Sequence, residues 1–254
     1  MGLKGAMFDL SGRTAVVTGG SRGLGREIVR AFAEAGADVV IASRKLDNCR
    51  QLADEVTSEH GVRALPVACH VGNWEDINSL AATAFDEFGK VDVLVNCAGM
   101  SPHYSSLGAV SEELYDKVLD VNLKGAFRLS AIVGERMAAT DGGSIISISS
   151  ATAEIPSGNE IPYAAAKAGL NSMTLGMAQT FGPKVRVNAI VAGPFLTDIS
   201  SAWDMDEFAS TTAPRIALKR AGEPHEIVGT ALYLASDASS YTSGALIKVD
   251  GGYL

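Results

Sequence analysis

The first apolar run of the chain is Thr14-Ala15-Val16-Val17-Thr18, and it leads directly into Gly19-Gly20-Ser21-Arg22-Gly23-Leu24-Gly25. The run predicts a short buried strand, and the residues from Arg26 to Ala35 predict a helix after the turn. Gly19 permits the tight turn, Gly23 lets the backbone approach a phosphate, and Gly25 lets helix and strand pack closely. The helix N-terminus then offers free N–H groups to a pyrophosphate. The Gly-x-x-x-Gly-x-Gly spacing departs from the commoner Gly-x-Gly-x-x-Gly but keeps this strand and helix context.

Further apolar runs alternate with helical stretches along the rest of the chain. They lie at Val39–Ala42, Ala64–Ala68, Val91–Val95, Ser144–Ile148, Val185–Val191 and Ala245–Val249. Such alternation predicts an α/β protein with a doubly wound Rossmann fold, in which helices cover both faces of a parallel sheet of about seven strands. No repeat or linker divides the chain, so residues 1–254 are expected to form one domain. The region from about 195 to 223 lacks periodicity and is interpreted as a substrate lid, the alternative being a loosely packed surface excursion.

Composition excludes several functions. The formal charge of −8 argues against nonspecific nucleic-acid binding. No apolar run approaches the roughly 20 residues that span a bilayer, and residues 1–10 lack the pattern of a secretory signal, so we expect a cytoplasmic protein. The three cysteines, Cys49, Cys69 and Cys97, form no Cys-x-x-Cys pair. They are expected to be reduced thiols, and no metal site is predicted.

A tyrosine and a lysine stand four residues apart in Tyr163-Ala164-Ala165-Ala166-Lys167. On a helix this spacing places both side chains on one face. A neighbouring cation favours a phenolate, so we expect Lys167 to lower the pKa of Tyr163 from about 10 and to suit it to acid–base catalysis. The alternative is an ordinary surface helix.

Taken together, these motifs resemble the short-chain dehydrogenase/reductase family over essentially the whole chain. The glycine turn is similar to the cofactor loop of the family, Asn96-Cys97-Ala98-Gly99 to its signature after the fourth strand, and Asn122 to its helix asparagine. Ser150, rather than Ser149, stands thirteen positions before Tyr163, as the family serine does. Ser149 is then expected on the other face of the strand.

The resemblance implies hydride transfer between a nicotinamide cofactor and a ketone or secondary alcohol. Tyr163 would exchange the proton on oxygen and Ser150 would orient the substrate. Lys167 would hold the nicotinamide ribose, and Asn122 would hold a water that links Lys167 to solvent. The residues expected to bind the cofactor are Gly19, Ser21, Arg22, Gly23, Leu24, Ser43, Arg44, Val71, Asn96, Ala98, Gly99, Tyr163, Lys167, Phe195 and Thr197.

Charge at the end of the second strand favours NADP(H), with NAD(H) as the alternative. Enzymes that prefer NAD place a carboxylate there, whereas this chain continues with Ser43-Arg44. Arg22 and Arg44 suit a 2′-phosphate, or else are solvated surface arginines. His70 stands where the family commonly has aspartate. It is either an acceptor for the adenine amino group or a structural histidine.

The expected partner is a small ketone or alcohol. A 3-oxoacyl thioester is the first candidate, preferably free rather than carrier-bound because the lid is acidic. The alternatives are an NAD-dependent alcohol or hydroxysteroid dehydrogenase, and a nucleotide-sensing Rossmann protein without turnover. The resemblance also implies a homo-oligomer, a dimer or a tetramer, through the helices around Asn122 and Tyr163.

Overall fold

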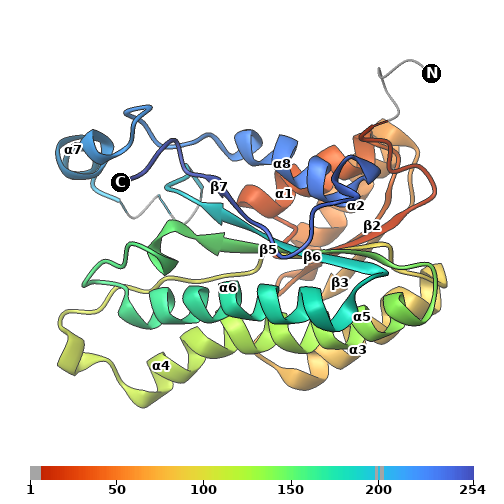
Figure 1. The fold of residues 1–254 in the computed structure, drawn as a ribbon, viewed down its shortest axis with the longest axis horizontal. Helices are drawn as coiled ribbons and strands as arrows, with labels where there is room; N and C mark the ends of the chain where they lie inside the picture. The colour runs from red at the N-terminus through yellow and green to blue at the C-terminus, as the bar shows by residue number, and fades with distance from the viewer. Residues whose placement is uncertain (1–6, 198–199, 201–202) are drawn as a thin grey trace.

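The structure, a computed structural model, describes residues 7–197, 200 and 203–254. In these ranges seven strands form one sheet in the order β3-β2-β1-β4-β5-β6-β7, and every neighbouring pair is parallel (Figure 1). The strands are β1 (Thr14–Thr18), β2 (Asp38–Ser43), β3 (Ala64–Ala68), β4 (Val93–Asn96), β5 (Gly143–Ser150), β6 (Val185–Ala192) and β7 (Leu246–Val249). The predicted doubly wound fold is therefore confirmed.

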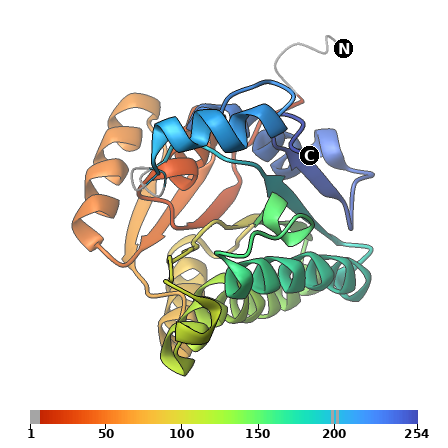
Figure 2. The same ribbon diagram turned by 90° about the vertical axis from the view of Figure 1, so that its left-hand side faces the viewer.

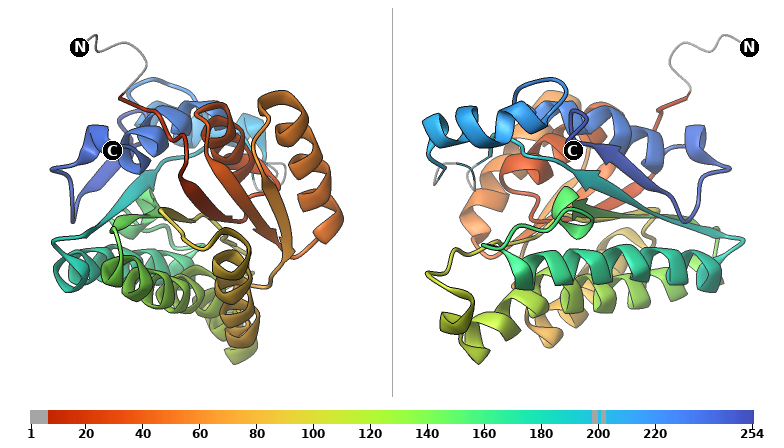
Figure 3. Two further views of the ribbon diagram at one scale, coloured as in Figure 1. Left: turned by 90° about the vertical axis from the view of Figure 1, so that its right-hand side faces the viewer. Right: turned by 60° about the vertical axis from the view of Figure 1, so that its left-hand side comes forward.

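Helices cover both faces of the sheet, as Figures 2 and 3 show. The α-helices of the described ranges are α1 (Gly23–Glu34), α2 (Leu46–His60), α3 (Trp74–Phe88), α4 (Glu112–Leu119), α5 (Gly125–Ala139), α6 (Ile161–Phe181), α7 (Met205–Glu207) and α8 (Val228–Ala235). A π-helical turn, η2 (Asp120–Lys124), joins α4 to α5. Helices α1, α2 and α8 lie on one face, and α3, α5 and α6 lie on the other.

Successive side chains of a strand point to opposite faces of the sheet and pack in two separate hydrophobic cores, one on each face. Val17 of β1 packs in the cluster that contains Phe32 of α1, whereas its neighbour Val16 packs in the cluster that contains Leu80 of α3. Both valines are essentially inaccessible to solvent. A strand covered on both faces needs apolar side chains at consecutive positions, which explains the continuous apolar runs.

The order of the strands reverses between β1 and β4, where Thr18 and Asn96 are register partners. In open α/β sheets, ligands bind beyond the carboxyl ends of the strands at such a switch point. The glycine turn after β1 and the residues 97–99 after β4 leave the sheet side by side here.

Several element boundaries differ from the expected ones. Strand β4 begins at Val93 rather than Val91, β5 extends to Ser150, and α1 begins at Gly23 because the glycine turn itself leads into the helix. All three cysteines are free thiols. None of the helices in the described ranges is both long and apolar enough to span a membrane. Nor do these ranges contain a group of three or more His, Cys, Asp or Glu side chains placed to hold a metal ion.

Candidate active site

The glycine turn adopts backbone angles that favour glycine. Gly19 and Gly23 have φ values of +64° and +53°. A Cβ added to Gly19 would lie 2.9 Å from the main-chain nitrogen of Ala98, and one added to Gly25 would lie 2.3 Å from the oxygen of Gly19. The glycines therefore let the turn fold against its own helix and against the loop after β4.

The turn delivers the N-terminus of α1 to the switch point. Its N-cap, Arg22, has an extended backbone and makes no side-chain capping bond, and the first turn of the helix carries no acidic residue. The first N–H groups of a helix have no partner within the helix, and the helix dipole favours an anion beside them. This end of α1 can therefore receive a phosphate group.

Two serines meet beside the turn at the end of β2. The hydroxyl of Ser21 donates to Ser43 Oγ at 2.9 Å. Arg44 follows as an exposed side chain. Glu55, on α2, is held by Arg26 at 3.0 Å and by Arg30 at 2.7 Å. Strand β2 thus ends in hydroxyls and a guanidinium, as the sequence predicts.

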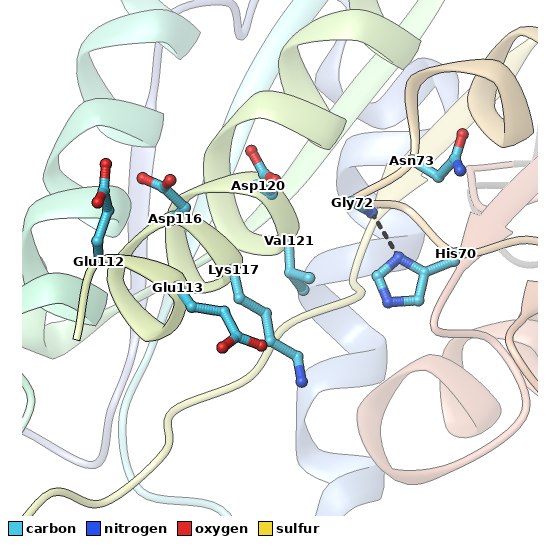
Figure 4. A pocket seen from close by; sticks show the side chains of 9 residues that line it. All are labelled: His70, Gly72, Asn73, Glu112, Glu113, Asp116, Lys117, Asp120 and Val121. Atoms are coloured by element: carbon cyan, nitrogen blue, oxygen red, sulfur yellow. Dashed lines mark hydrogen bonds between the residues drawn. The ribbon is translucent and has the colours of Figure 1, made fainter. Parts of the chain in front are cut away.

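The loop after β3 carries Val71 and His70. A Cβ added to Gly125 would lie 2.0 Å from Val71 O, so this glycine lets the loop approach the start of α5. The main-chain N–H of Gly72 donates to His70 Nδ1 at 3.1 Å (Figure 4). In a neutral imidazole with Nδ1 as acceptor, Nε2 carries the proton. His70 therefore presents a donor, and the expectation that it accepts from an adenine amino group does not fit this arrangement.

His70 also borders a cavity of about 760 Å³ between this loop and the segment formed by α4 and the start of the π-helical turn η2 (Figure 4). Its lining is His70, Gly72, Asn73, Glu112, Glu113, Asp116, Lys117, Asp120 and Val121. Ser150, Tyr163 and Lys167 are not among the lining residues, so the volume of this cavity is no guide to where the chemistry takes place.

The loop after β4 is fixed by hydrogen bonds to β1. Thr18 Oγ1 accepts from the main-chain N–H groups of Cys97 at 3.2 Å and Ala98 at 3.4 Å. The amide of Asn96 points elsewhere and donates to Ser130 Oγ on α5 at 2.9 Å. A Cβ added to Gly99 would lie 3.7 Å from Lys167 Nζ. Gly99 therefore lies beside the lysine, and the same Cβ would press more closely on Asn122 Oδ1, at 3.0 Å.

Asn122 is buried within the π-helical turn. Its amide nitrogen donates to the oxygens of Met100 at 2.8 Å and Val118 at 2.9 Å, and its Oδ1 accepts from Met100 N at 3.1 Å. The side chain is thus committed to fixing the residue after Gly99. These contacts do not test the expected role of holding a water for Lys167, which stays a prediction.

Ser150, Tyr163 and Lys167 come together where β5 meets α6. The Lys167 ammonium is buried, donates to Ile148 O at 2.8 Å, and lies 5.6 Å from the centroid of the Tyr163 ring. Ser150 lies close enough to the phenol to lower the pKa of Tyr163, and its Oγ accepts from Thr152 Oγ1 at 2.9 Å. Ser149 points to the main-chain oxygen of Lys167 instead, in agreement with the choice of Ser150.

Burial dominates the electrostatics of this cluster. It raises the pKa of Tyr163 to about 12, which the hydrogen bond with Ser150 only partly offsets and which Glu160 and Cys97 raise further. Burial lowers the pKa of Lys167 to about 8, against the opposing charge of Cys97. The expected lowering of the Tyr163 pKa by Lys167 is not seen in this structure, because burial of the phenol raises that pKa and Lys167 is not among the groups that shift it.

The segment after β6 closes over the glycine turn. Phe195 is buried, and a Cβ added to Gly23 would lie 3.5 Å from Thr197 Cβ. Gly222 N donates to Pro194 O and Gly222 O accepts from Leu196 N, both at 2.9 Å. These two bonds join the ends of the segment expected as a lid.

Within the lid segment the chain forms α7, a π-helical turn and a 3₁₀ turn. Trp203 stacks on Phe208 with 5.4 Å between ring centroids. Residues 198–199 and 201–202 of the expected lid lie outside the described residues.

Sequence reasoning missed several polar residues of the site. Thr18 and Thr152 were overlooked as hydrogen-bond partners, and so was the contact in which Ser101 Oγ donates to Glu160 Oε2 at 3.2 Å. The sequence could have predicted that Glu160 lies near Tyr163, because residues three positions apart share one face of a helix.

The residues present fit a dinucleotide. The glycine turn, the helix N-terminus without a side-chain cap and the Ser21–Ser43 pair at the end of β2 suit a phosphate and a ribose, and Gly99 lies beside Lys167.

The comparisons with known proteins agree with this geometry. Residues 19–254 match the family described as enoyl-(acyl carrier protein) reductase. A short chain dehydrogenase/reductase of Aspergillus oryzae is 38% identical over 251 residues, which cover 96% of each chain. L-rhamnose 1-dehydrogenase (NAD(P)(+)) of Azotobacter vinelandii is 38% identical over 248 residues, covering 94% of this chain and 96% of the relative.

Among solved structures, 7α-hydroxysteroid dehydrogenase complexed with NADH and 7-oxo glycochenodeoxycholic acid superposes with a TM-score of 0.94 at 32% identity. The alignment covers 100% of this chain and 98% of that one. Fold, site geometry and relatives lead to one conclusion, that the chain belongs to the short-chain dehydrogenase/reductase family and is an NAD(P)-dependent oxidoreductase acting on CH–OH and C=O groups.

Proposed function

We propose that the protein reduces a small ketone to a secondary alcohol with NADPH. The observation that carries the proposal is the cluster of Ser150, Tyr163 and Lys167 beside Gly99, in which Ser150 and Lys167 are buried and Tyr163 is half-buried. The bound dinucleotide would supply the hydride to the carbonyl carbon.

Tyr163 would supply the proton to the carbonyl oxygen. Its pKa of about 12 keeps the phenol protonated at neutral pH, so that the proton is present for transfer. Ser150, which lies close enough to the phenol to lower its pKa, would hydrogen-bond the same oxygen and orient it. Lys167 would donate to the ribose beside the nicotinamide from its place beside Gly99.

The remaining residues would position the cofactor. The backbone of Gly19, Ser21, Gly23 and Leu24 would hold the pyrophosphate, and Val71, Asn96, Ala98 and Gly99 would line the adenosine and ribose side through main-chain atoms. Phe195 and Thr197, which close over the turn, would contact the carboxamide.

The preference for NADP(H) over NAD(H) rests on the end of β2. Ser43, Arg22 and the exposed Arg44 suit a 2′-phosphate, and Glu55 is already engaged by two arginines. The name of the Azotobacter vinelandii relative covers both cofactors, and the hydroxysteroid dehydrogenase was solved with NADH. An NAD-dependent alcohol or hydroxysteroid dehydrogenase is thus the second candidate.

A 3-oxoacyl group on a carrier protein is disfavoured because Arg215 and Arg220 are already engaged in contacts within the chain. A carrier would need a basic docking patch. Arg220 instead bonds both carboxylate oxygens of Glu226, at 2.6 and 2.7 Å, and Arg215 donates to Leu254 O while stacking on Tyr253. Among 3-oxoacyl compounds we therefore favour a free thioester or ester.

Two helices on the α3–α5–α6 face support a homo-oligomer, a dimer or a tetramer. Phe127 of α5 and Leu175 of α6 are both nearly half exposed, and large apolar side chains exposed together on one face often mark an interface. Light scattering of the purified protein would measure the assembly directly.

The test of the proposed function is a panel of free ketones read by loss of reduced cofactor. We expect turnover with NADPH, weaker turnover with NADH, and formation of the secondary alcohol. Tight cofactor binding without turnover of any ketone or alcohol would instead identify a nucleotide sensor.

A further inference from the structure

A carboxylate stands one helical turn from the proposed proton donor, and the reaction as described above does not use it. Glu160 is the N-cap of α6, three residues before Tyr163, and it is only partly exposed. It lies close enough to raise the pKa of the tyrosine. Burying a carboxylate costs free energy unless the group is well paired.

The described contacts of Glu160 leave most of its capacity to accept hydrogen bonds unused. Its single side-chain hydrogen bond within the described residues comes from Ser101 Oγ, at 3.2 Å. Among the described residues, the ion pairs of lysine and arginine do not include Glu160, its side chain makes no capping bond to α6, and the cationic group near enough to act on its pKa is His103. An ionised carboxylate offers about four lone-pair sites, so roughly three remain.

The hydrogen bond between Ser101 and Glu160 is not needed to hold the loop after β4 against the start of α6, because other hydrogen bonds already hold it there. Tyr104 OH donates to Gly158 O at 2.9 Å and accepts from Ile161 N at 3.0 Å. The same loop is held at Met100 by both ends of the Asn122 amide. Ser101 is thus presented by a fixed backbone, as is Glu160 on the first turn of α6.

The charges around Tyr163 limit what can occupy this place. The carboxylate of Glu160 disfavours an anionic group in a substrate, and the ammonium of Lys167, on the same helix face, disfavours a cationic group. A neutral group that donates a hydrogen bond is compatible with both. A hydroxyl can also exchange hydrogen bonds with Ser101.

We propose that Glu160 and Ser101 form a specificity subsite that binds a hydroxyl group of the substrate near the reacting carbonyl, so that hydroxylated neutral ketones are preferred over plain ketones and over keto acids. This inference rests on the proposed function and names the substrate class of the same site. A site built to bond a hydroxyl rejects the analogue that lacks it, because its polar groups are then left unpaired.

The test compares three ketones of similar size: 1-hydroxybutan-2-one, pentan-2-one and 2-oxopentanoate. We expect kcat/KM of the wild type with NADPH to be about tenfold to 100-fold higher for the hydroxyketone than for either of the others. In Glu160→Gln the ratio of hydroxyketone to plain ketone should fall at least about fivefold, and Ser101→Ala should lower it less. Glu160→Lys should reverse the order of the hydroxyketone and the keto acid.

Glu154→Gln is the matched control. Glu154 lies, like Glu160, between β5 and α6, but it forms an ion pair with Lys248 at 2.6 Å. This variant should keep the wild-type ratio. Circular dichroism and thermal melting identify any variant that fails to fold. If Glu160→Gln does not fold, the ratio measured for Ser101→Ala decides whether the subsite exists. Equal kcat/KM for the three ketones, or ratios unchanged in both Glu160→Gln and Ser101→Ala, would overturn the subsite. Absence of turnover with every ketone would instead refute the proposed function.

Discussion

The ammonium of Lys167 lies over the ring of Tyr163, 5.6 Å from its centroid, rather than at the phenol oxygen. Their four-residue spacing on α6 brings the two side chains to one helix face, while the bond to Ile148 O at 2.8 Å draws the ammonium toward β5. Lys167 thereby points to the space beside Gly99. Its main contribution is then to ligand binding, and the phenol keeps its proton.

The first prediction is that cofactor binding depends on the protonation of Lys167. Burial lowers its pKa to about 8, so the side chain is cationic below that pH and loses its charge above it. The Kd for NADPH should therefore rise about tenfold between pH 7 and pH 10, as one charge-assisted hydrogen bond is lost. Fluorescence titration across this range measures the effect. Lys167→Met should bind weakly with little pH dependence, and a flat profile for the wild type would contradict the assignment.

The second prediction concerns Tyr163→Phe. The substitution removes the proton donor but keeps the ring and its packing, so turnover should fall about 10²–10⁴-fold while the Kd for NADPH changes little. Single-turnover kinetics with any accepted ketone measures the first quantity, and fluorescence titration measures the second. Near-normal turnover would show that another group delivers the proton.

Local patterns were sufficient to predict the fold. Each strand is covered on both faces and therefore appears as a continuous apolar run, and the turn after β1 requires glycine at Gly19 and Gly25 for steric reasons that concern neighbouring residues. Ser21 and Ser43 could be assigned to one place because Ser21 follows β1 and Ser43 ends the adjacent parallel strand β2. In both cases the positions of the residues in the sequence determine which of them meet in the fold.

Properties that depend on burial or on distant contacts could not be predicted in this way. The pKa of Tyr163 is set by desolvation, which the five residues from Tyr163 to Lys167 do not reveal. The pairing of Ser101 with Glu160 joins positions 59 residues apart in the chain. The geometry of His70 depends on the N–H of Gly72, which takes the ring nitrogen expected to accept from adenine.

The third prediction is that Gly25→Ala destabilises the protein. The added Cβ would lie 2.3 Å from the oxygen of Gly19, so the turn would have to shift, at a cost of about 1–3 kcal/mol or more. The melting temperature should fall by roughly 5 °C. Gly229→Ala is the control, since a Cβ there meets no heavy atom of the described residues within 4 Å and alanine favours a helix. A melting temperature of Gly25→Ala equal to that of the control would contradict the tight packing of the turn.

The fourth prediction is that Arg44→Asp reverses the cofactor preference. In the wild type, NADPH should bind more than tenfold more tightly than NADH, because each hydrogen bond from a guanidinium to the 2′-phosphate contributes about 1.5–3 kcal/mol. An aspartate at position 44 would repel that phosphate and accept from a ribose hydroxyl instead. Arg50→Asp is the control, because it makes the same change of charge six residues further along the chain, on α2. The guanidinium of Arg50 is exposed and pairs with Asp47 at 3.1 Å. This substitution should therefore leave the ratio of the two Kd values within about twofold, since exposed charges contribute little. Equal affinities of the wild type for NADPH and NADH, or an equal loss of preference in both variants, would mean that Arg44 does not contact the phosphate.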